Sequence, residues 1–179
     1  MDPAMKWTLA VALSALFMAS AAMKFADISQ FAAALENYRI LPMVLVAPSA
    51  LVIPALELLA ALGLLVPGTR ADASLLTAAL LAIFTAAIAI NLARGRREID
   101  CGCFGPALRQ TLSGWLIARN AVLLVAVAAL VAPAQVRPLG LADFVTIGFG
   151  AATLMVLYAS MNYLLANAPW IRELERFHA

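Results

Sequence analysis

The sequence predicts an all-α protein that is a polytopic membrane helix bundle. Hydrophobic residues make up 65% of the 179 residues and charged residues only 12%, whereas ordinary soluble domains have about 45–50% and about 25%. The mean hydropathy is +0.96. A soluble chain of this size could not bury so much apolar surface, which excludes soluble enzymes and disordered proteins. The net charge of +2 without a basic stripe excludes a nucleic-acid-binding protein.

The chain contains five apolar stretches, each near the ~20 residues that a membrane-spanning helix needs. We expect the first, residues 5–23, to be retained, because its apolar run exceeds the ~7–15 residues of a signal-peptide core. Residues 24–40 place apolar side chains at helical spacing between charged ones, which predicts a short interfacial helix. The second span, residues 43–66, begins among prolines and ends at a Pro-Gly turn.

Three further spans complete a single membrane domain that covers residues 1–179. They are predicted at residues 74–92, 113–131 and 141–165. Asn162 and Asn167 are expected to mark the exit of the last span from the membrane. The predicted architecture is a four-helix core with a fifth transmembrane helix and a short interfacial helix after the first span.

Polar residues inside these spans are the candidate functional residues, because an ionisable group in a membrane costs several kcal/mol. Glu57 lies within the second span, and Arg119 lies about two turns into the fourth. With five spans, Arg119 and Lys24 belong to the same membrane side, so one of them is expected to neutralise Glu57. Two interpretations remain open: a structural clasp between helices, or a Glu57 that carries a proton or tunes a thiol. The predicted buried polar network comprises Lys24, Asp27, Glu57, Asn91, Arg119 and Asn120.

Both cysteines of the chain, Cys101 and Cys103, lie within three residues of each other in the predicted loop 94–112. Arginines surround them and a helix follows, and both features favour a thiolate. A disulfide across one residue is strained and labile, and it closes too small a loop to stabilise the fold. The pair is therefore a candidate redox-active dithiol, with Asp100 as a candidate proton acceptor.

Two other interpretations of the cysteines remain open. Two thiolates can hold Cu(I), but zinc requires about four ligands, and the only histidine, His178, lies at the far C-terminus. We therefore predict no complete metal site of the protein itself. The remaining possibility is that the two cysteines are inert residues of a turn.

The order of these motifs resembles the MauE family of methylamine utilisation clusters, within a broader MauE/DoxX group of redox-associated membrane proteins. The resemblance covers residues 5–130 and runs from Lys24-x-x-Asp27 through Glu57 to Arg94-Gly95. Its most specific part is Asp100-Cys-Gly-Cys-Phe-Gly105 with the downstream Arg119-Asn120. The four-helix core with cysteines just before a span is also similar in layout to DsbB and vitamin K epoxide reductase.

The resemblance implies a thiol–disulfide oxidoreductase of the bacterial inner membrane. Its expected role is maturation of a periplasmic client such as the disulfide-rich small subunit of methylamine dehydrogenase, together with a membrane-tethered thioredoxin-like partner similar to MauD. If the chain oxidises this partner, a quinone in the bilayer is the simplest next electron acceptor; no other cofactor is expected. The alternatives are a non-enzymatic assembly anchor or chaperone, and a Cu(I)-binding membrane protein.

The charge pattern and the implied client predict opposite orientations for the cysteine loop. Five spans put three Lys and Arg residues on the side of the N-terminus and nine on the side of the cysteines. The positive-inside rule then places the cysteines in the cytoplasm. A periplasmic client requires the reverse, and arginines beside a reactive thiol have a chemical purpose of their own. We expect the cysteines to react at the periplasmic face, with a cytoplasmic N-terminus.

Overall fold

The computed structural model describes residues 1–96, 99, 112–133 and 137–177, with side chains described as far as Leu164. Every element in this part of the chain is a helix. Five of these helices are long and apolar enough to cross a membrane, which confirms the predicted polytopic helical bundle. The helices are α1 (Pro3–Ala26), α2 (Ile28–Tyr38), α3 (Met43–Leu65), α4 (Arg70–Ala93), α5 (Gly114–Val131) and α6 (Leu141–Phe177).

Local signals explain where the first helices begin and end. Asp2 accepts a hydrogen bond from the Ala4 amide at 2.8 Å and so caps the start of α1. Asp27 follows α1 and caps α2 by accepting a bond from the Gln30 amide at 2.9 Å. The α2 helix ends at Tyr38, and its C-cap Arg39 has a φ of 48° in the left-handed region. The predicted interfacial helix is therefore a separate element set off by a capping aspartate.

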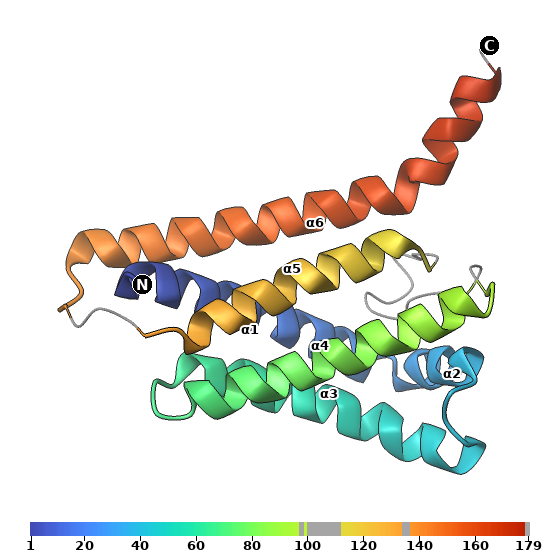
Figure 1. Cartoon of the computed structure of the whole chain (residues 1–179), viewed down its shortest axis with the longest axis horizontal. Coiled ribbons are helices and arrows are strands. Elements are labelled where there is room, and N and C mark those ends of the chain that lie inside the picture. The colour runs from blue at the N-terminus through green and yellow to red at the C-terminus, as the bar shows by residue number, and fades with distance from the viewer. Residues whose placement is uncertain (97–98, 100–111, 134–136, 178–179) are drawn as a thin grey trace.

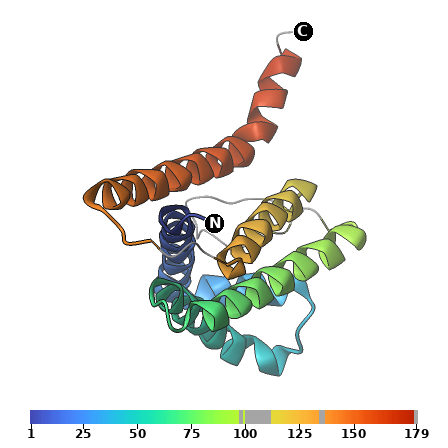
Figure 2. The same ribbon diagram turned by 60° about the vertical axis from the view of Figure 1, so that its left-hand side comes forward.

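The spanning helices alternate in direction, so consecutive spans are antiparallel (Figure 1). The α1 helix is central and contacts α3, α5 and α6, while α4 packs against α3 and α5. Figure 2 shows α6 lying along α1 on the side away from α4. The main core lies where these helices meet, and its buried side chains include Leu13, Phe17, Leu64, Leu81 and Val127.

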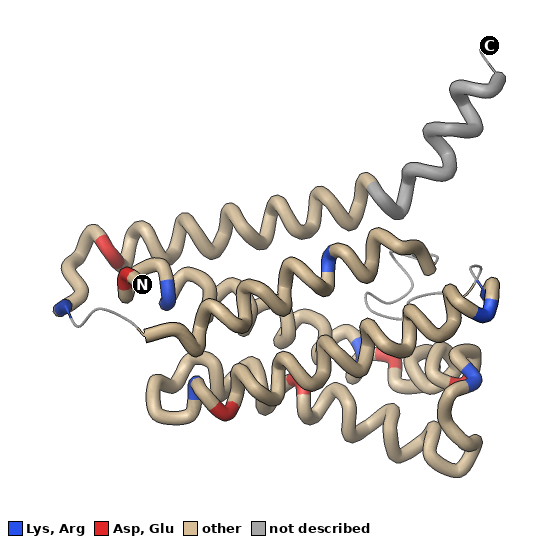
Figure 3. Tube along the Cα trace, viewed as in Figure 1, with Lys and Arg blue, Asp and Glu red and all other residues tan. Residues whose placement is uncertain are grey.

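The two ends of the bundle hold different segments of the chain. The N-terminus, the α3–α4 turn and the α5–α6 connection lie at one end, where Lys6 Nζ donates to the Ala132 carbonyl at 2.8 Å. The α2 helix, the end of α4 and the start of α5 lie at the other. Charged residues are concentrated near these ends, with few between them (Figure 3). The cysteine-containing connection therefore leaves and re-enters the bundle beside α2.

Two helices are longer than the membrane spans predicted within them. The α4 helix begins at Arg70, four residues before the span predicted from residue 74. The Arg70 Nε donates to the Leu64 carbonyl at 2.9 Å, and its guanidinium lies 4.0 Å over the Trp7 ring. The α6 helix continues to Phe177, beyond the predicted end at residue 165. Falling hydropathy marks where a helix leaves the bilayer, and it need not end the helix itself. The apolar span within α6 is Leu141–Leu164.

Candidate functional site

An ion pair between α1 and α3 lies at the centre of the site. Lys24 Nζ pairs with Glu57 Oε1, and their side chains are only 4% and 1% exposed. Long side chains on a helix point back toward its N-terminus, so Lys24 reaches along α1 and also donates to Ser20 Oγ at 2.9 Å. Ser20 Oγ in turn lies 3.3 Å from Glu57 Oε1. Lys24, which lies one turn after Ser20 on α1, therefore neutralises the buried charge of Glu57.

A second polar group extends from α5 to α4 and α6. Arg119 donates to Asn162 Oδ1 at 2.7 Å and to Asn120 Oδ1 at 3.4 Å. Asn120, 3% exposed, donates to Thr85 Oγ1 at 3.1 Å. The Arg119 guanidinium also lies 5.6 Å from the centre of the Tyr158 ring. These contacts connect α4, α5 and α6.

The two groups line one small cavity, here called the polar cavity, of about 40 Å³. Glu57 Oε2 is buried there without a hydrogen-bond partner among the described residues. A polar cavity of this size has room for water, and a buried carboxylate oxygen without a partner is costly. The cavity is therefore suited to a water molecule that hydrogen-bonds to Glu57. Its polar lining residues are Ser20, Lys24, Glu57, Arg119, Asn120 and Tyr158.

The structure brings four of the predicted network residues to this cavity: Lys24, Glu57, Arg119 and Asn120. It places Asp27 elsewhere, as the cap of α2, where bonds from the Gln30 amide and the Ser29 hydroxyl lower the pKa of its carboxyl. Asn91 is fully buried near the end of α4 and accepts a bond from Arg96 at 3.4 Å. The candidate catalytic residues Asp100, Cys101 and Cys103 lie outside the described residues.

Sequence reasoning missed three polar residues that complete the network. Ser20 lies four positions before Lys24, the spacing of neighbours on one helix face, and this spacing is a usable signal. Thr85 and Asn162 carry no comparable signal, because their partners Asn120 and Arg119 lie on other helices. Among the described residues, no three His, Cys, Asp or Glu side chains are grouped so as to hold a metal ion.

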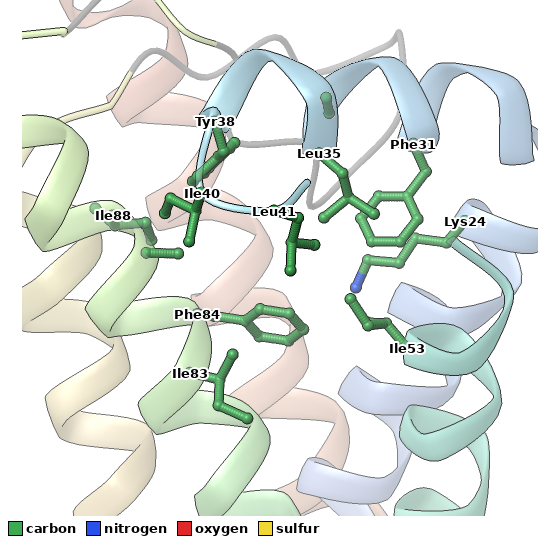
Figure 4. Close-up of a pocket in the computed structure, with 12 residues that line it drawn as sticks. Lys24, Phe31, Leu35, Tyr38, Ile40, Leu41, Ile53, Ile83, Phe84 and Ile88 are labelled. Atoms are coloured by element: carbon green, nitrogen blue, oxygen red, sulfur yellow. The ribbon is translucent and has the colours of Figure 1, made fainter. Parts of the chain in front are cut away.

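Beside the polar cavity lies a larger apolar pocket of about 140 Å³ between α1, α2, α3 and α4. Lys24 lines both spaces. Its Nζ lies 4.9 Å from the centre of the Phe84 ring and 5.2 Å from that of Phe31. Figure 4 shows the Lys24 ammonium pointing into the space between these two rings. The remaining lining residues are Ala34, Leu35, Tyr38, Ile40, Leu41, Ile53, Ile83, Ala87 and Ile88.

Comparison with known proteins decides the family. The family model described as methylamine utilisation protein MauE matches residues 2–133. The chain belongs to the MauE family. It is 39% identical to MauE of Paracoccus denitrificans over 91% of this chain and 88% of that protein. It is 41% identical to MauE of Paracoccus versutus, again over 91% of this chain and 88% of that protein.

A third relative extends the comparison to another genus. MauE of Methylorubrum extorquens is 41% identical over 81% of this chain and 80% of its own length. No solved structure shows a significant match to the chain. MauE membership and the five apolar helices together make the chain a multi-pass bacterial membrane protein.

Proposed function

We propose that this MauE-family chain is a membrane thiol–disulfide exchange protein of methylamine utilisation. It acts with a membrane-tethered thioredoxin-like partner, similar to MauD, to mature a periplasmic client such as the small subunit of methylamine dehydrogenase. The names of its relatives support the pathway. The observation that carries the chemistry is the pairing of the chain's only cysteines, Cys101 and Cys103, in an arginine-rich connection before α5.

The described residues on either side of the cysteine segment contact each other. The Leu112 amide donates to the Ile99 carbonyl at 3.2 Å, so the chain on either side of the cysteine segment is held together. Leu112 and Leu116 are buried with Ile88 in a small core at the α2 end of the bundle. The segment between Ile99 and Leu112 therefore starts and finishes at one anchored point beside α5.

The proposed reaction is disulfide exchange. The thiolate of one cysteine attacks a disulfide sulfur, forming a mixed disulfide and releasing the other sulfur as a thiolate; the second cysteine then resolves this bond. Arginines of the connection stabilise the thiolate, and Asp100 accepts the thiol proton. In the oxidising direction, the chain's disulfide takes two electrons from the partner's dithiol and becomes a dithiol itself.

Cysteine substitution tests this proposal. Cys101→Ser and Cys103→Ser should each abolish formation of the client's native disulfides, while expression and helix content stay unchanged. One of the two single variants should also accumulate a mixed disulfide with the thioredoxin-like partner, visible as a reducible band on a gel. Full client maturation by the Cys101→Ser, Cys103→Ser double variant would leave the chain with the non-enzymatic role of an assembly anchor.

A further inference from the structure

We infer that the apolar pocket beside Lys24 binds the single-ring head group of an isoprenoid quinone, which reoxidises the dithiol. This inference rests on the proposed function, because a chain that oxidises its partner becomes a dithiol and needs an oxidant to restore its disulfide. The position and chemistry of the pocket are independent of that need.

The size of the pocket fits one six-membered ring. Its volume is about 140 Å³, and an apolar protein cavity of ~150 Å³ holds a benzene molecule. The phenyl rings of Phe31 and Phe84 lie on either side of the Lys24 ammonium (Figure 4). Aromatic side chains at this spacing can contact the face or edge of a planar ring.

The charge in the pocket favours a neutral ligand with a hydrogen-bond acceptor. Lys24 is 5% exposed, and two of its three ammonium protons serve Ser20 and Glu57. The third is available to a ligand oxygen in the pocket. Because Glu57 already neutralises Lys24, an anionic ligand would bring in an uncompensated buried charge, whereas a quinone carbonyl accepts the hydrogen bond without one.

The mouth of the pocket is reached from the lipid. Ile40, Leu41 and Ile83 line it and are 39%, 36% and 60% exposed, although all three are large and apolar. In a membrane-spanning chain such side chains face acyl chains. A ligand with a long apolar tail can therefore place its ring in the pocket and leave the tail in the bilayer.

The proposed redox step is balanced in atoms and electrons. Cys101 and Cys103 lose two protons and two electrons as their sulfur–sulfur bond forms. The quinone gains two electrons and two protons as its two carbonyl groups become hydroxyl groups. The chain returns to the disulfide form, ready to oxidise the next partner dithiol.

The test measures binding of 2-decyl-1,4-benzoquinone to the purified full chain in nanodiscs. Ala87→Phe fills the pocket from α4 while leaving both members of the Lys24–Glu57 pair in the sequence, and it should abolish binding and quinol formation. Ala86→Phe is the matched control, because Ala86 is exposed and does not line the pocket. The paired variant Lys24→Met, Glu57→Leu removes both charges together and should weaken binding at least tenfold.

Two further samples separate this inference from the proposed function. The Cys101→Ser, Cys103→Ser variant should bind the quinone as the wild type does but form no quinol. Decane, a tail without a ring, should not compete for the site. Equal binding by Ala87→Phe and Ala86→Phe, or full competition by decane, would overturn the inference whatever the cysteine variants do in client maturation. Quinone binding together with full maturation by the cysteine variant would overturn the proposed function alone.

Discussion

At the scale of single residues, Lys24 has the most consequential position in the molecule. It pairs with Glu57, contacts Ser20 and two phenyl rings, and lines both the polar cavity and the apolar pocket. A buried ion pair adds little net stability compared with apolar residues of the same size, but an unpaired partner is costly. The pair therefore links α1 to α3 and also places an ammonium donor where two spaces meet.

Removal of one partner should destabilise the bundle. Glu57→Ala leaves Lys24 buried without its counter-ion, so the free energy of unfolding should fall by ~3–5 kcal/mol. The double variant Lys24→Met, Glu57→Leu should recover part of this loss, because neither charge remains. Folded yield and denaturation in detergent measure both effects. Glu36→Ala, at an exposed position on α2, is the control and should unfold like the wild type.

The same variants separate the two roles of Glu57. A Glu57→Gln chain that folds normally and yet fails to mature the client would assign Glu57 a role in proton transfer or thiol tuning. Wild-type yield and wild-type maturation in Glu57→Ala would contradict both the clasp and the functional role.

At the scale of helices, close approach depends on small residues. A methyl group added at Gly63 of α3 would lie 2.8 Å from the Ala73 Cβ on α4, which is nearer than two carbon atoms can pack. Small residues let the backbones of membrane helices approach closely. The α2 helix depends instead on its cap, because it is only 11 residues long and a short helix is marginal by itself.

The Gly63 contact predicts a destabilising substitution whose effect a second substitution should reverse. Gly63→Ala should lower the free energy of unfolding by ~1–3 kcal/mol, because α3 and α4 must move apart. Adding Ala73→Gly makes room for the new methyl group and should restore much of the thermal stability. Gly148→Ala on α6 meets nothing within 4 Å and is the control. Equal melting temperatures for Gly63→Ala and Gly148→Ala would contradict this account of the α3–α4 contact.

The cap of α2 should respond to acid. Hydrogen bonds from the Gln30 amide and the Ser29 hydroxyl hold the pKa of Asp27 below its ordinary value of 3.8. The stabilisation is therefore complete above pH 3.8 and is lost as the pH falls through the lower folded-state pKa. Amide exchange at Gln30, corrected for its intrinsic pH dependence, should accelerate relative to mid-helix amides of α3 in this acid range. In Asp27→Asn, which caps without titrating, that change should be absent.

At the scale of the whole molecule, the two ends of the bundle carry different chemistry. One end is fastened by Arg137, which binds Asp2 and Asp143. The other end carries α2, the apolar pocket and the entry to the cysteine segment. The Arg94 guanidinium there donates to the Arg39 carbonyl at 3.3 Å, linking the end of α4 to the end of α2. The orientation of the bundle in the membrane therefore decides which compartment the cysteine segment faces.

We predict that the cysteine end faces the periplasm. After mild reduction, a membrane-impermeant thiol reagent should label Cys101 or Cys103 in intact cells. A single cysteine introduced by Gly68→Cys in a chain with both native cysteines replaced by serine provides the control. Gly68 is exposed in the α3–α4 turn at the opposite end, so it should be labelled only after lysis. The reverse pattern would show that the positive-inside rule, which counts nine basic residues at the cysteine end, sets the topology.

Composition and periodicity were sufficient to predict the helical bundle and to place Glu57 inside it, in need of a cationic partner. Long apolar runs specify spans without reference to any partner, and a carboxylate inside such a run needs a cation wherever the helices pack. The choice of Lys24 over Arg119 as that cation depended on the tertiary structure, because it turns on how far α1 and α5 lie from α3. The link from Asn120 to Thr85 and the two cavities also arise only when helices meet. Local hydrophobicity determines which segments form spanning helices. A site built between helices depends on distances between segments, which no single segment encodes.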